Sequence, residues 1–136
     1  MSLRALPTIL IAFFLYNIVV GIWGTEVLLH PVHANIPLPS GATWSLTVGD
    51  LILVTMLILL FIELLKSATT SSAGLIDHAL SMVVFIICLL EFILWKGAAT
   101  STFFFLTIAT LIDTISGYTI GTAVAKRSIG FGGPTS

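Results

Sequence analysis

Five acidic side chains lie inside or at the ends of long apolar stretches of the sequence. They are Asp50, Glu63, Asp77, Glu91 and Asp113. An ionisable side chain in such a segment costs a few kcal/mol near the centre of a membrane, and it usually faces protein or water. Groups of this kind often mark proton or cation paths. The set therefore has two interpretations, an ion path or a group of helix-end and helix-pairing residues.

The ion-path interpretation uses the acids in two layers. If the segments 46–65 and 75–95 form a hairpin of helices, Glu63 lies level with Asp77 at one end, and Asp50 lies level with Glu91 at the other. His78 exchanges a proton near neutral pH, so the inner cluster would be the protonatable site. That inner cluster comprises Glu63, Asp77, His78 and Asp113, and the outer pair Asp50 and Glu91 would form the mouth of the path.

The alternative interpretation gives most of these acids a local structural role. Lys66 follows Glu63 at the i+3 position, which suits an ion pair near a helix end. Asp50 and Asp77 fall in the first turns of their expected helices, where the positive helix end stabilises a carboxylate. Asp113 is the deepest acid and has no cation near it in the sequence, so both interpretations stay open for it.

One seam joins several of these polar groups. Along the segment 75–95, residues at alternating spacings of four and three fall on one helical face. They are Asp77, Ser81, Val84, Cys88, Glu91 and Trp95, and they form the most polar stripe of the sequence.

The segment before residue 46 contains the only candidate metal ligands we identify. Glu26, His30 and His33 follow i, i+4, i+7 spacing, and three such side chains can bind zinc or copper. Pro31 would interrupt a helix that carried them, so we predict no metal site and interpret the histidines as interfacial. The single cysteine, Cys88, excludes a disulfide within the chain.

Catalysis finds little support in the sequence. No Ser-His-Asp or Cys-His set shares a membrane depth, and no phosphate-binding loop is present. The glycine-rich stretch 130–133 is predicted to belong to a flexible tail that begins at residue 128. We therefore predict that the protein is not an enzyme and carries no cofactor.

The composition places the chain in a membrane. Of its 136 residues 57% are hydrophobic and 8% are charged, with 5 basic and 6 acidic side chains. Soluble domains carry about 25% charged residues. These values exclude an ordinary cytosolic domain, a disordered chain and a nucleic-acid binder. Membrane lipids are the expected surroundings.

Four apolar segments are each long enough to cross a hydrocarbon core of about 30 Å as a helix. They run over about 5–23, 46–65, 75–95 and 99–123. Their short connections predict that the last three helices are antiparallel neighbours. The segment 24–45 contains three prolines and is predicted to be an extended or turn-rich outer flap. The fold prediction is an all-α, four-span membrane bundle, one domain over 1–136.

Basic residues and tryptophans orient this bundle. Lys and Arg concentrate in cytoplasmic loops, and Trp side chains gather at membrane surfaces. Four basic residues fall on one side of the predicted membrane, and Lys96 falls on the other. The four are Arg4, Lys66, Lys126 and Arg127, and the outer helix ends carry Trp23, Trp44 and Trp95. Both termini are therefore predicted to be cytoplasmic, and the first span to be retained.

Small and polar residues predict how the helices pack. Gly117 and Gly121 form a small-xxx-small pattern, and Asn17 is an amide that can hydrogen-bond across a helix interface. Both features suit packing within the bundle as well as an oligomer. The stretch 51–61 is apolar nearly all round, so it faces lipid or a partner.

Four short strings carry a family resemblance: Leu6-Pro-Thr-Ile-Leu10, Pro37-Leu-Pro-Ser-Gly41 followed by Trp44, Val48-Gly-Asp-Leu51 and Leu75-Ile-Asp-His78. On these strings the chain resembles small, functionally uncharacterised four-span inner-membrane proteins of Gram-negative bacteria. The resemblance implies a location in the bacterial inner membrane. It implies no activity and transfers no site residues.

The leading functional hypothesis is an accessory or scaffolding subunit that stabilises or regulates a larger inner-membrane complex. It follows from the small extramembrane mass, the missing catalytic set and the apolar and small-residue helix faces. The alternative is a small homo-oligomeric transporter, coupled to protons or cations, that uses the intramembrane carboxylates.

Overall fold

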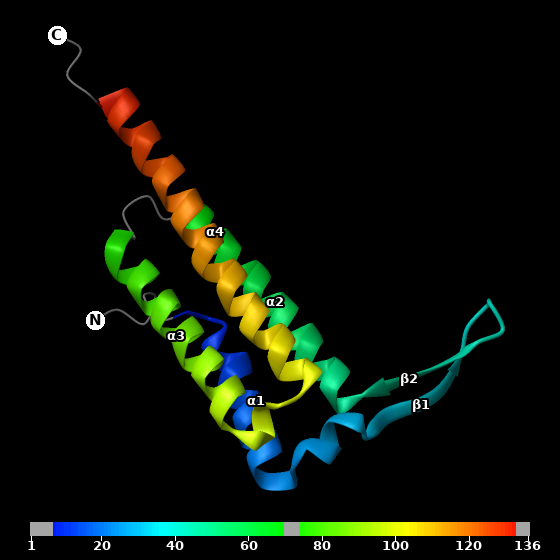
Figure 1. The fold of residues 1–136 in the computed structure, drawn as a ribbon. Coiled ribbons are helices and arrows are strands. Elements are labelled where there is room, and N and C mark those ends of the chain that lie inside the picture. The colour runs from blue at the N-terminus through cyan, green and yellow to red at the C-terminus, as the bar shows by residue number, and fades with distance from the viewer. Residues whose placement is uncertain (1–6, 70–73, 133–136) are drawn as a thin grey trace.

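The computed structural model describes residues 7–69 and 74–132. Within them lie four α-helices, two short 3-10 helices and one β-hairpin (Figure 1). In chain order the elements are α1 (Leu10–Trp23), η2 (Thr25–Leu29), β1 (Pro31–Pro37), β2 (Thr43–Thr47), α2 (Val48–Thr69), α3 (Gly74–Leu94), η3 (Lys96–Ala98) and α4 (Ser101–Gly132). The prediction of a mainly helical chain is confirmed.

Helix α4 holds the bundle together. It packs along both α2 and α3, whereas α2 and α3 share no comparable interface within the described residues. Figure 1 shows α2 and α4 side by side and running in the same direction, with α3 running the opposite way. The prediction that α2 and α3 pack as a hairpin is therefore wrong. The layering of Glu63 with Asp77 stays a prediction, because the Asp77 side chain lies outside the described part of the structure. Short loops limit the distance between helix ends, and they leave open which helices pack along their length.

Helix α2 starts directly after strand β2 with a reciprocal cap. The backbone N–H of Thr47 donates to Asp50 Oδ2 at 3.0 Å, and the backbone N–H of Asp50 donates to Thr47 Oγ1 at 3.2 Å. This exchange satisfies two backbone donors at the helix start. Gly49 makes the same corner tight, because a Cβ there would lie 3.0 Å from the Leu28 carbonyl oxygen.

The segment predicted as an outer flap forms a hairpin. Strands β1 and β2 are antiparallel, with Pro31 opposite Thr47 and Pro37 opposite Thr43. The register shifts between His33 and Ile36, where Asn35 has a φ of 56°. The hairpin projects sideways from the end of the bundle where α2 and α4 begin (Figure 1). Prolines and turn residues predicted extended chain here, but they did not reveal the pairing.

Helix α4 is longer than the sequence predicted. It continues to Gly132, so the flexible tail predicted from residue 128 is wrong for residues 128–132, while 133–136 lie outside the described residues. Among the residues searched, its apolar stretch covers Ser101–Gly117. The sequence predicted a span over 99–123, and the helical backbone extends past the end of that segment.

One described helical stretch, Val48–Lys66, is both long and apolar enough to cross a membrane. Three shorter apolar stretches accompany it, namely Leu10–Trp23, Ala79–Leu94 and Ser101–Gly117. The four predicted apolar segments thus all contain helices. That all four helices cross a membrane is part of the proposed function.

Tyr16 ties α1 to the connection between α3 and α4. Its side chain is fully buried, and its ring centroid lies 4.9 Å from that of Phe103. The phenol oxygen is 2.7 Å from the carbonyl oxygen of Gly97, to which it donates, and 2.6 Å from Thr100 Oγ1. A tyrosine at this position thus supplies both packing and the polar contact that closes the end of the bundle.

We expect Tyr16→Phe to lower the free energy of unfolding by about 1–2 kcal/mol, because the change leaves the Gly97 carbonyl and the Thr100 hydroxyl without this partner. Thermal unfolding of the purified protein in detergent measures the loss. Thr55→Val is the matched control, since that hydroxyl bonds only its own helix, to the Leu51 carbonyl. Equal stability of Tyr16→Phe and the wild type would contradict this role.

Candidate buried ion site

Helix α4 buries a polar stripe in the centre of the bundle. The buried side chains are Thr107, Thr110, Asp113 and Thr114. Each threonine hydroxyl donates to a carbonyl of its own helix, at 3.0 Å to Phe103, 2.6 Å to Thr107 and 2.9 Å to Thr110 respectively. These bonds use the hydroxyl hydrogens, so the oxygens keep lone pairs free to accept.

Asp113 lies where three helices meet. Its side chain is only 3% exposed. Ser81 of α3 is within hydrogen-bonding reach of the carboxylate, and Glu63 of α2 is close enough to interact with it electrostatically. Its Oδ2 atom is buried and has no hydrogen-bond partner among the described residues. Buried polar atoms in proteins are nearly always paired, so this oxygen requires an explanation.

Glu63 is buried too, but it is well partnered. Lys66 Nζ lies 2.9 Å from its Oε1 atom, which confirms the predicted i+3 ion pair. The backbone N–H of Thr8 donates to the same oxygen, and Lys66 Nζ donates to Thr8 Oγ1 at 3.4 Å. These contacts fasten the start of the chain to the end of α2. They also leave the Glu63–Lys66 pair electrically neutral beside Asp113.

The structure thus brings together part of the predicted inner cluster. Glu63 and Asp113 meet as predicted, although across α2 and α4. Asp77 and His78 lie on α3, but their side chains are outside the described part of the structure. From the sequence, Ser81 is recognised only as a member of the polar stripe along the segment 75–95. Its contact with Asp113 depends on the packing of α3 against α4, which the sequence pattern does not reveal.

The two outer acids do not share a site. Asp50 caps the start of α2, as the structural interpretation expected. Glu91 of α3 accepts a hydrogen bond from Asn17 Nδ2 at 3.4 Å, and Asn17 also donates to the Phe13 carbonyl. Asn17 therefore links α1 to α3 within the bundle. The described contacts give no support to the predicted mouth formed by Asp50 with Glu91, because each acid serves a different helix contact.

The remaining predicted residues separate in the fold. Glu26 lies in η2, His33 lies in β1 and His30 lies between them, so the helical spacing of the three is not realised. The described residues contain no group of three or more His, Cys, Asp or Glu side chains placed to hold a metal ion. Gly117 is buried in α4, while the surroundings of Gly121 lie outside the described part.

Glu63→Gln tests whether the Glu63–Lys66–Thr8 contacts stabilise the fold. We expect a loss of about 1–3 kcal/mol in the free energy of unfolding, because the half-buried ammonium of Lys66 loses its charged partner. Chemical unfolding in mixed micelles measures it. Glu26→Gln removes an equal charge from an exposed site and is expected to stay within about 0.5 kcal/mol. Equal effects of the two substitutions would show that the contacts add no stability.

Comparisons with protein families, curated proteins and solved structures found no match to this chain. The resemblance to four-span inner-membrane proteins therefore stays a prediction. The functional proposal rests on the geometry of the chain itself.

Proposed function

We propose that this protein is a multi-pass protein of the bacterial inner membrane and serves as an accessory or scaffolding subunit. In this role it stabilises or regulates a larger membrane complex. The proposal combines three observations: an apolar exterior, an apolar groove between two helices and a projecting hairpin.

The exterior of the helices supports a membrane location. Large apolar side chains are exposed on all four, for example Ile22 on α1, Leu57 on α2, Ile93 on α3 and Ile115 on α4. Asp113 and three threonines of α4 are buried inside the bundle instead. A soluble protein of this size rarely exposes so much apolar surface, whereas lipid and partner helices both cover it favourably.

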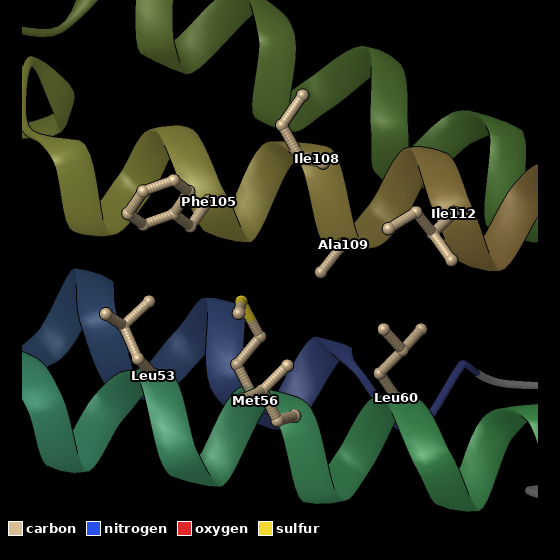
Figure 2. Close-up of a pocket in the computed structure, with 8 residues that line it drawn as sticks. Leu53, Met56, Leu60, Phe105, Ile108, Ala109 and Ile112 are labelled. Atoms are coloured by element: carbon tan, nitrogen blue, oxygen red, sulfur yellow. The ribbon is translucent and has the colours of Figure 1, made fainter.

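An apolar groove runs between the parallel helices α2 and α4. It has a volume of about 270 Å³. Figure 2 shows Leu53, Met56 and Leu60 of α2 directed toward α4, with Ala109 of α4 directed back toward α2. The lining residues are Leu53, Met56, Leu57, Leu60, Phe105, Ile108, Ala109 and Ile112. A groove of this shape and chemistry suits an apolar helix of another subunit.

The hairpin is the observation that carries the accessory role. Most side chains of β1 and β2 are exposed, including Val32 and Trp44. A two-stranded hairpin without a packed face is at best marginally stable in water. This one extends past α2 at the outer end of the bundle (Figure 1). A neighbouring subunit beside α2 would lie beneath the hairpin and cover it.

Native electrophoresis of membranes in mild detergent, with mass spectrometry of the band that carries this chain, tests the proposal. We expect migration with a stoichiometric set of larger subunits. We expect Leu57→Trp to weaken that association several-fold by filling the edge of the groove. Ile58→Trp is the matched control, because Ile58 is 56% exposed against 57% for Leu57 but does not line the groove. Migration of the wild type as a small homo-oligomer would refute the accessory role.

The proposed orientation has its own test. Ser40 lies exposed in the hairpin turn, and the native Cys88 is fully buried. We expect Ser40→Cys to react with a membrane-impermeant maleimide from the periplasmic side of intact inner membranes. Ser2→Cys should react only after the membrane is opened. The reverse pattern would place the termini outside.

A second candidate function is a homo-oligomeric transporter coupled to protons or cations. The unpaired oxygen of Asp113 favours it. A bundle of four helices rarely encloses an aqueous path, so this function requires several copies of the chain around a common path. A monomer in mild detergent would count against it.

A further inference from the structure

We propose that the unpartnered carboxylate oxygen of Asp113 marks a binding site for a single monovalent cation, held by carboxylate and hydroxyl oxygens from α2, α3 and α4. The inference extends the second candidate function by naming the ion class and its ligands. Its test measures binding, so a failure to bind and a failure to transport are distinguishable. Binding is also compatible with the accessory role.

One carboxylate oxygen of Asp113 is buried without a described partner. The Asp113 side chain is 3% exposed, and its Oδ2 atom accepts no hydrogen bond from any described residue. A buried carboxylate oxygen without a donor loses the hydration it had in water and gains nothing in return. A cation bound at Oδ2 would supply the missing interaction.

The described charged side chains around Asp113 do not neutralise its carboxylate. The charged side chains shown to act on Asp113 are Glu63 and Lys66, both from α2, and Lys66 is already bonded to Glu63 and to Thr8. From α3 the described neighbour is the uncharged Ser81. Among the side chains that the structure describes, the pair on α2 is neutral and Asp113 contributes one unmatched negative charge. One monovalent ion balances it, whereas a divalent ion would leave an excess positive charge.

The buried polar side chains at and next to Asp113 offer oxygen atoms as ligands. The Thr114 hydroxyl uses its hydrogen on the Thr110 carbonyl, so its oxygen can only accept. The Thr110 hydroxyl bonds the Thr107 carbonyl and also lies within hydrogen-bonding reach of Cys88 on α3. Thr110 and Thr114 lie within one turn of Asp113 on α4 and are buried. Carboxylate and hydroxyl oxygens are hard ligands that suit alkali-metal ions and protons rather than soft transition metals. An alkali-metal ion and a proton share the same chemistry here, because each brings a single positive charge to an oxygen atom.

Thermal unfolding of the full-length protein in detergent distinguishes an alkali-metal ion from a proton. In one arm, sodium chloride replaces choline chloride at constant ionic strength and pH 8. In the other, the pH falls from 8 to 5.5 in choline chloride. We expect the apparent Tm of the wild type to rise by about 5 °C or more in one arm. A rise with sodium identifies a metal ion, and a rise with acid alone identifies a proton.

Asp113→Asn preserves the shape of the side chain and should abolish the response in both arms. Ser81→Ala keeps the carboxylate and should move the midpoint of the response several-fold, so it tests the site even if Asp113→Asn fails to fold. Glu91→Gln, an acid-to-amide change at the other end of α3, should respond as the wild type does. The proposal is overturned if the wild type responds in neither arm, if Asp113→Asn keeps the response, or if Ser81→Ala leaves the midpoint unchanged.

Discussion

The polar stripe of α4 has to be enclosed, and the rest of the bundle depends on that constraint. Asp113 and three threonines project from one helix whose other faces carry exposed Phe105, Ile112 and Ile115. Helix α4 is therefore covered along its length by α2 and α3, and it separates them. Tyr16 and Glu63 then fasten α1 and the start of the chain to this three-helix arrangement. The result is a molecule with polar atoms inside and apolar atoms outside.

The sequence predicted the four helices, because each contains a continuous apolar segment, although α2 and α4 run past the ends of theirs. It also predicted the Glu63–Lys66 pair, since the two residues are three apart in the chain, and the place of Asp50 in the first turn of its helix, but not its exchange of hydrogen bonds with Thr47. It failed wherever the answer depended on packing. The neighbours of Glu91 and the contact of Ser81 with Asp113 follow from which helices lie side by side, and apolar periodicity does not contain that information.

The hairpin and the extended end of α4 show a second limit. The prolines of the segment 24–45 predicted extended or turn-rich chain without pairing, and Pro31 and Pro37 lie at the ends of β1, where a missing N–H is tolerated. The glycines of 130–132 suggested flexible chain, yet α4 continues through them, since glycine costs a helix only about 1 kcal/mol.

The groove and the ion site share two helices, and this connects the two functional proposals. Leu60 lines the groove on α2 and Glu63 follows it by three residues, while on α4 Ala109 precedes Asp113 by four. Residues three or four apart are neighbours on a helix surface. A helix seated in the groove would fix the spacing of α2 from α4, and the same spacing sets the separation of Glu63 from Asp113. Occupancy of the groove and affinity for the cation should therefore depend on each other, as linkage requires of two ligands that favour the same arrangement of the helices.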